Sequence, residues 1–138
     1  MATRIPKDYL PSDDEPFMNA RQREYFRRKL QDWKDDLIKG TRETVIILQN
    51  ESTQHPDDGD RAASESEKTL ELRTRDRHRK LINKIDSALR RLEEKTYGYC
   101  DETGDPISLK RLDARPIATM GVEAQERHEK RERVFRDD

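Results

Sequence analysis

The chain has 138 residues, of which 43% are charged and 30% are apolar, so it cannot bury a large core. Its 29 basic and 30 acidic side chains give a formal charge of -1, which excludes a general electrostatic attraction to nucleic acid. This composition is typical of long helices with solvated faces, because a coiled-coil seam needs only about two apolar positions in seven.

Residues 1–18 are predicted to form an irregular leader, because prolines recur in it. Tyr9, Leu10 and Phe17 are apolar enough to pack this leader on a folded body. No apolar run resembles a signal peptide or approaches membrane-spanning length, so we expect a cytoplasmic protein without membrane association. Cys100 is the only cysteine, which excludes an internal disulfide and agrees with a reducing compartment.

A first long helix is predicted from about residue 19 to residue 53. Asn19 followed by Gln22 has the spacing of a helix N-cap with a reciprocal partner three residues later. Apolar residues then alternate in steps of four and three, which is the pattern of a coiled-coil seam. They are Phe26, Leu30, Trp33 and Leu37.

An acidic turn is predicted at residues 55–63, where Pro56 and Gly59 disfavour helical geometry. Three aspartates lie in this turn, namely Asp57, Asp58 and Asp60. Asp60 is also the natural N-cap of the following helix, a role that contributes about 1 kcal/mol.

A second helix is predicted from Arg61 to Thr96, a stretch without proline or glycine. Its apolar residues at helical spacing are Leu70, Leu81, Ile85, Leu89 and Leu92. Two helices of matched length joined by a short loop predict an antiparallel coiled-coil hairpin over residues 19–96. Basic residues of the second helix also recur every three or four positions: Arg73, Arg77, Lys80 and Lys84. Their spacing alone favours a solvated helix face over a binding stripe.

Residues 97–138 are predicted to form a small body. Gly98 is placed where a left-handed residue would end the second helix, and residues 107–109 are predicted to be extended. A last helix is predicted from about residue 122 to residue 135, with little apolar surface. The predicted fold is therefore mainly α-helical, with an irregular leader, a long hairpin and a small body that ends in a helix.

Two separated stretches resemble a known family. The first reads DDGDRAA at 57–63, LELRTRDR at 70–77 and RKLI at 79–82, and the second reads YGYC at 97–100 and RLDARP at 111–116. In this order and spacing they are similar to the DksA/TraR family of bacterial transcription regulators. The resemblance implies a protein that binds RNA polymerase directly and inserts its hairpin tip into the secondary channel. With the nucleotide ppGpp it would alter initiation at selected promoters in the stringent response, without sequence-specific DNA binding. We also expect a monomer.

At the tip, the resemblance implies polymerase contacts by Asp57, Asp60 and Ala62. Asp58 is the alternative first carboxylate. Carboxylates at a narrow end can meet basic groups or a metal-dependent active region, and a small alanine permits close approach.

For ppGpp, the resemblance implies contacts by Arg77, Leu81, Lys84 and Arg115. Several cations could hold a pyrophosphate by charge-assisted hydrogen bonds. The family's lysine early in the last helix is Gln125 here, which would weaken ppGpp binding unless Lys130 or Arg127 substitutes.

Zinc ligation is the largest departure from the family. Relatives hold zinc with four cysteines, and the matching positions here are Cys100, Thr103, Gly121 and Ala124. Even with His128 the chain offers only two ligands, so we expect a degenerate zinc finger without zinc. Apolar and aromatic side chains should hold the body instead: Tyr97, Tyr99, Ile107, Leu109, Leu112, Ile117 and Met120. For Cys100 a small buried core residue is favoured over a redox sensor.

Two other functions stay open beside the regulator. No enzyme is predicted, since the three histidines are scattered and no glycine-rich phosphate loop occurs. A Gre-type transcript cleavage factor shares the hairpin with an acidic tip, but the YGYC and ARP motifs do not suit it. A non-catalytic helical adaptor, whose tip is only a solvated loop, is the other alternative.

Overall fold

The computed structural model describes residues 4–51 and 58–137, apart from the side chains of residues 44, 45, 47–51, 58–64 and 135–137. Within these ranges the chain forms four helices and no strand: α1 (Ala20–Glu51), α2 (Asp58–Glu94), α3 (Leu109–Ala114) and α4 (Val122–Asp137). The predicted mainly α-helical fold is confirmed. None of these helices is long and apolar enough to cross a membrane.

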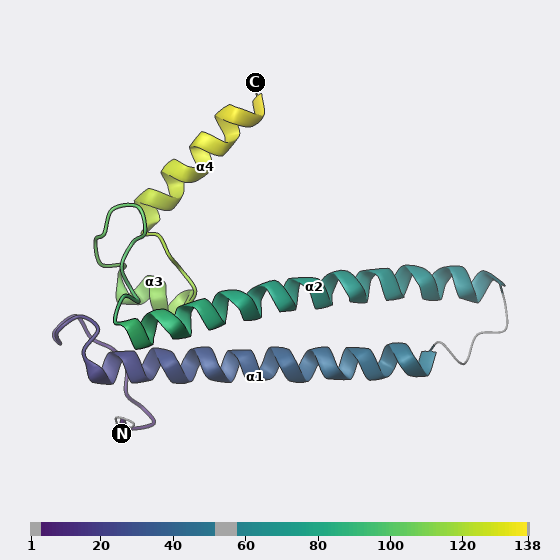
Figure 1. Ribbon diagram of the computed structural model, residues 1–138, viewed down its shortest axis with the longest axis horizontal. Coiled ribbons are helices and arrows are strands. Elements are labelled where there is room, and N and C mark those ends of the chain that lie inside the picture. The colour runs from purple at the N-terminus through teal and green to yellow at the C-terminus, as the bar shows by residue number, and fades with distance from the viewer. Residues whose placement is uncertain (1–3, 52–57, 138) are drawn as a thin grey trace. The chain divides into compact units, whose positions relative to one another are not determined.

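The two long helices α1 and α2 lie side by side and run in opposite directions, as the predicted hairpin requires (Figure 1). The chain divides into two compact units, one formed by Met1–Leu30 with Ser87–Asp138 and the other by Gln31–Asp86. Each unit therefore contains a part of both long helices. The division into a leader, a hairpin over 19–96 and a C-terminal body stays a prediction.

The predicted N-cap of α1 is confirmed. The Asn19 side-chain oxygen accepts a hydrogen bond from the backbone N–H of Gln22 at 2.9 Å. The Gln22 side chain, which is fully buried, reaches back to the backbone N–H of Met18 at 2.7 Å rather than to that of Asn19. Its amide nitrogen also donates to the Ser12 carbonyl at 3.1 Å. One glutamine therefore ties the leader to the first turn of α1.

The start of α2 differs from the prediction, and the N-cap role of Asp60 is wrong. The helix begins at Asp58, so Gly59 and Asp60 both lie within its first turn. Helical glycine costs only about 1 kcal/mol, and aspartate in a first turn is favoured by the helix dipole. Neither residue therefore prevents the helix from starting early. The part of the predicted turn at residues 52–57 lies outside the described residues.

The end of α2 also differs, because Lys95 and not Gly98 is the left-handed residue that ends it. Lys95 has φ 63°, and its N–H donates to the Leu92 carbonyl at 3.3 Å. The N–H of Thr96 donates to the Arg91 carbonyl at 2.9 Å, which completes a Schellman motif. These two hydrogen bonds offset the steric cost of about 1–2 kcal/mol for a lysine in this conformation.

The unit formed by residues 1–30 and 87–138 contains the main core. Its buried apolar side chains are Phe26, Leu30, Ala88, Leu92, Tyr97, Cys100, Ile107, Leu109, Leu112, Ile117, Ala118 and Ala124. Most of the residues predicted to hold the body are among them, but Tyr99 is 38% exposed and its ring makes a T-shaped contact with Phe17, with the two centroids 5.4 Å apart. The predicted extended piece at 107–109 is shorter than expected, because Ser108 is extended with φ −58° and ψ 142° but Leu109 already begins α3.

The unit formed by residues 31–86 is more thinly packed. Ile85 is fully buried, and Lys34 of α1 pairs with Asp86 of α2 at 2.7 Å. Leu70, predicted on the seam, is 62% exposed. A pair of helices covers only a narrow stripe of each partner, so an apolar residue near the seam stays largely solvated.

Candidate functional site

The predicted tip residues lie at the start of α2. Asp57 is outside the described residues, whereas the backbones of Asp60 and Ala62 belong to the first two turns of the helix. Positions 60 and 62 are two residues apart, and residues at that spacing do not share a helix face.

The four basic residues Arg73, Arg77, Lys80 and Lys84 are all exposed on α2. Arg77 makes one long contact, from its Nη2 to the Thr74 hydroxyl at 3.5 Å. Leu81 is half-buried beside them. The cations predicted to hold ppGpp on this helix are therefore open to solvent.

A groove of about 500 Å³ opens between α1 and α2 within residues 31–86. Its apolar lining comes from Ile38, Leu72 and Ile82. Arg75, Arg79 and Asp76 also line it, and Arg79 lies 3.3 Å from Asp76. No residue predicted to contact the polymerase or ppGpp lines this groove.

Arg115, the fourth residue predicted to contact ppGpp, belongs to the other compact unit. It is the C-cap of α3, where its backbone N–H donates to the Arg111 carbonyl at 2.7 Å. Its carbonyl accepts from the N–H of Ala118 at 3.0 Å. The Arg115 side chain is exposed to solvent, whereas its backbone is held by hydrogen bonds on both sides.

Sequence reasoning missed a polar network that joins α1 to α3. The Tyr25 hydroxyl donates to Asp113 Oδ1 at 2.6 Å. Lys29 Nζ donates at 2.6 Å both to the same oxygen and to the Asp113 backbone carbonyl. Tyr25 and Lys29 lie one turn apart on α1 and so share a helix face. This spacing of a hydroxyl and an ammonium group was the only feature of the sequence that could have indicated the network.

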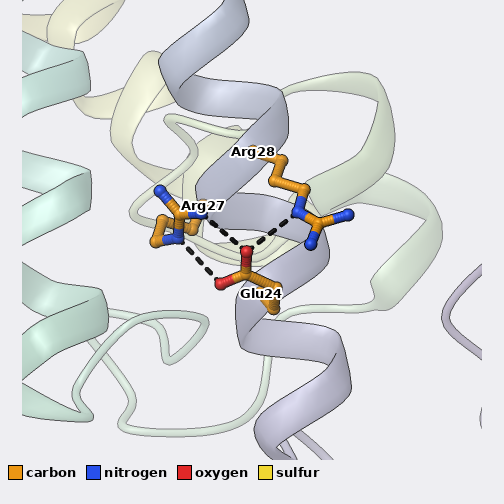
Figure 2. A network of polar contacts seen from close by, with 3 residues as sticks. All are labelled: Glu24, Arg27 and Arg28. Atoms are coloured by element: carbon orange, nitrogen blue, oxygen red, sulfur yellow. Dashed lines mark hydrogen bonds and ion pairs between the residues drawn. The ribbon is translucent and has the colours of Figure 1, made fainter. Parts of the chain in front are cut away.

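A second polar network lies on α1 alone (Figure 2). Glu24 is only 7% exposed, and its carboxylate accepts hydrogen bonds from Arg27 Nε at 2.8 Å, Arg27 Nη2 at 2.6 Å and Arg28 Nε at 2.8 Å. Hydrogen bonds from Arg27 and then from Arg28 hold the pKa of Glu24 below its ordinary value of 4.5, against the opposing effect of burial.

The chain forms a closed turn from Cys100 to Gly104 at the first pair of lost zinc positions. The N–H of Gly104 donates to the Cys100 carbonyl at 2.8 Å, and Ala124 is buried. A hydrogen bond from the Thr103 hydroxyl, followed by the backbone N–H groups of Gly121, Thr103 and Glu102, lowers the pKa of the buried Cys100 thiol to about 7. These hydrogen bonds favour the thiolate form of Cys100.

These residues do not fit a structural zinc ion, which needs four nitrogen or sulfur ligands. Cys100 supplies one sulfur, Thr103 a hydroxyl, and Gly121 and Ala124 no donor side chain. Throughout the part of the chain that the structure describes, no three His, Cys, Asp or Glu side chains are grouped to hold a metal.

The position of the family's lysine in the last helix is taken by Gln125, which is half-buried and donates to Glu129 at 3.3 Å. Of the two candidate substitutes, Arg127 is 3.8 Å from Glu102, and Arg131 shares that carboxylate at 3.3 Å. Lys130 is exposed. A carboxylate therefore competes for Arg127, and Lys130 is the freer candidate to replace the lost charge.

Comparison with known proteins identifies the family. The model described as "DnaK suppressor protein DksA, N-terminal domain" matches residues 22–92, and that of the "Prokaryotic dksA/traR C4-type zinc finger" matches residues 95–130. The chain belongs to the DksA/TraR family. Its match to the C4-type zinc finger persists although only one of the four cysteine positions holds a cysteine.

Individual DksA relatives match almost end to end. The RNA polymerase-binding transcription factor DksA of Caulobacter vibrioides is 66% identical over 131 residues, which cover 95% of this chain and 92% of that protein. Its counterpart in Escherichia coli is 42% identical over 91% of this chain and 83% of that protein. The structure of transcription factor DksA2 from Pseudomonas aeruginosa is similar with a TM-score of 0.79 at 39% identity, covering 87% of this chain and 95% of that one.

Proposed function

We propose that this protein is a transcription regulator that binds RNA polymerase directly and alters initiation at selected promoters. The supporting observation is the 66% identity, over 95% of the chain, to a protein named RNA polymerase-binding transcription factor DksA. In this proposal the protein acts in the cytoplasm as a monomer, catalyses no reaction and binds no specific DNA sequence. The near-neutral charge of the chain agrees with contact to a protein rather than to DNA.

The tip of the hairpin enters the secondary channel of the polymerase, where Asp57, Asp60 and Ala62 make the contacts that change initiation. The placement of Asp60 in the first turn of α2 supports this role, because the capping role that would compete with it has been removed. The helix dipole still favours an aspartate at this position, so the test below separates a contact with a partner from a role in the helix alone.

The charge of Asp60 is tested by Asp60→Asn, which keeps the size of the side chain. We expect the variant to co-elute with RNA polymerase as the parent does but to lose inhibition of a ribosomal RNA promoter in vitro. Glu67→Gln, which removes an exposed carboxylate two turns further along α2, is the matched control and should regulate normally. Normal regulation by Asp60→Asn contradicts the charged-tip proposal, and failure of the parent to co-elute contradicts polymerase binding altogether.

The effector in this proposal is ppGpp, contacted by Arg77, Leu81, Lys84 and Arg115. The exposure of Arg77, Lys84 and Arg115 supports it, because guanidinium and ammonium groups open to solvent can bind phosphate without first breaking an ion pair. The exposed Lys130 is the proposed replacement for the family's lysine at Gln125.

A Gre-type role is distinguished from the proposed one by a transcript cleavage assay. Arrested transcription complexes incubated with the protein should show no cleavage of the backtracked RNA. Cleavage would favour the Gre-type alternative, which shares the paired helices and the acidic tip. Absence of both cleavage and promoter inhibition would leave the helical adaptor as the better account.

A further inference from the structure

Asp113 joins α1 to α3 through three hydrogen bonds, although the Lys29 and Asp113 side chains are 37% and 44% exposed. Asp113 receives the Tyr25 hydroxyl and Lys29 Nζ on the same oxygen, each at 2.6 Å. Lys29 Nζ also lies 5.8 Å from the centroid of the Tyr25 ring, so the two donors support each other. The network contains one cation, one anion and one neutral hydroxyl, and each has a partner.

At neutral pH each group of the network is in the protonation state that forms its hydrogen bonds. Hydrogen bonds from Lys29 and then from Tyr25 lower the pKa of Asp113 below its ordinary value of 3.8. Burial, followed by the hydrogen bond to Asp113, raises the pKa of Tyr25 to about 12. Near pH 7 Asp113 is therefore charged and Tyr25 keeps its proton, which are the forms that make charge-assisted hydrogen bonds.

Lys29 also binds the backbone of α3. Its Nζ lies 2.6 Å from the carbonyl oxygen of Asp113, which is one of the last carbonyls of α3 and has no partner inside the helix. At six residues, α3 is too short to be stable alone. A lysine from α1 therefore satisfies the end of a helix that needs external support.

Arg115 follows Asp113 by two residues, and its backbone is fixed on both sides. Its N–H and carbonyl are bonded to Arg111 and Ala118, and the next carbonyl, that of Pro116, accepts the Tyr97 hydroxyl at 2.7 Å. The guanidinium itself is exposed. An exposed cation on a fixed backbone has less freedom to lose when it binds an anion.

We propose that Asp113, held by Tyr25 and Lys29, is a positioning residue that fixes Arg115 for the nucleotide response. The inference rests on the proposed contact between Arg115 and ppGpp. Asp113 itself touches neither the nucleotide nor the polymerase in this account. It acts through the backbone of the short segment from Asp113 to Arg115.

The test uses the full chain with RNA polymerase and measures the ppGpp concentration that gives half of the maximal inhibition of a ribosomal RNA promoter. In Asp113→Asn this concentration should rise about three- to tenfold, because a neutral amide weakens the hydrogen bonds from Tyr25 and Lys29 and holds the segment from Asp113 to Arg115 less firmly. Inhibition without ppGpp and affinity for the polymerase should equal those of the parent. Tyr25→Phe removes a single hydroxyl and should shift the concentration in the same direction, and it replaces Asp113→Asn if that variant does not fold.

The decisive comparison combines variants. In an Arg115→Ala background, Asp113→Asn should cause no further shift, since a positioning residue has nothing left to position. Lys29→Met should shift the ppGpp concentration, whereas Lys34→Met, which breaks the comparable 2.7 Å pair with Asp86, should not.

Each contrary result has a separate meaning. A shift in Arg115→Ala with none in Asp113→Asn and Tyr25→Phe overturns the positioning role but leaves the proposed ppGpp contact standing. Additive shifts in the double variant overturn it as well, because they indicate an independent effect of Asp113. A parental response of Arg115→Ala overturns the proposed contact and the positioning role together.

Discussion

Gly98 combines a backbone conformation that other residues rarely adopt with two close neighbours. Its φ is 92°, and a methyl group on its Cα would lie 3.1 Å from Phe17 Cζ and 3.2 Å from Met18 Cγ. The leader and the segment after α2 therefore approach each other at this glycine. Gly104 has a similar φ of 76°, but no atom lies within 4 Å of the place where its Cβ would be.

This contrast between two glycines predicts a difference in stability. Both Gly98→Ala and Gly104→Ala should lose about 1 kcal/mol through the left-handed backbone. Gly98→Ala should lose about 1–3 kcal/mol more, because its methyl group must displace Phe17 and Met18. Urea unfolding followed by circular dichroism measures both. Equal losses would mean that the leader does not press on Gly98 in solution.

At the scale of residues, the sequence could predict the cap at Asn19 but not the one at Lys95. An N-cap depends on a side chain that is visible in the sequence, and Asn19 with Gln22 has the required spacing. A Schellman motif depends on backbone hydrogen bonds and not on a particular side chain. The steric cost of the left-handed conformation at Lys95 is small enough that the hydrogen bonds to the Arg91 and Leu92 carbonyls offset it. The glycine three residues later was therefore a misleading signal.

In α1 the dominant local interaction is the carboxylate of Glu24 with Arg27 and Arg28 (Figure 2). Because the Glu24 side chain is only 8% exposed while the two arginines are about half exposed, the charge is held at the edge of the core. Removing the carboxylate charge weakens the hydrogen bonds that Arg27 and Arg28 make to this side chain, which should destabilise the first turns of α1.

The pH dependence of stability should report this arrangement. The native pKa of Glu24 is lowered, so its contribution is present above the ordinary value of 4.5 and is lost as pH falls through the native pKa. Glu24→Gln should cost about 1–2 kcal/mol at pH 7, and the difference from the parent should shrink below pH 4. Glu93→Gln, at an exposed position of α2, is the control. A difference that stays constant with pH would contradict the charge-based account.

Among the elements, the long helices could be predicted because apolar periodicity persists over many turns. The six-residue α3 could not, since its only internal signals are Leu109 and Leu112 and the contacts from Lys29 and Tyr25 come from a distant helix. The exposure of Leu70 was missed for a related reason. Periodicity identifies a face of a helix but does not say how wide a stripe the partner covers.

For the molecule as a whole, the body at residues 97–138 resembles a zinc finger in sequence but is held by apolar packing and hydrogen bonds. Tyr97, Ile107 and Leu112 are essentially buried, and the Cys100 turn is closed by the Gly104 hydrogen bond. The sequence could predict which side chains fill the body, but not the donors around the Cys100 sulfur. Those depend on the turn that brings Thr103 and Gly121 to it.

Metal analysis tests this architecture. Purified protein washed with chelator should contain no stoichiometric zinc, and its thermal unfolding should be unchanged by the chelator, because four ligands are not available. A sample given one equivalent of zinc before the wash is the control for retention. One tightly held zinc per chain, or a lower melting temperature after the wash, would contradict the proposal that the body is independent of metal.

The C-terminal helix α4 buries one methyl group, that of Ala124, while every other described side chain from Val122 to Val134 is half-buried or exposed. A helix of 16 residues is marginal in water without an apolar face to dock. Its ion pairs with Glu102 are exposed and add little. We therefore expect α4 to open and reclose as a separate, low-energy step of the native ensemble that leaves the cooperative unit around Tyr97 intact.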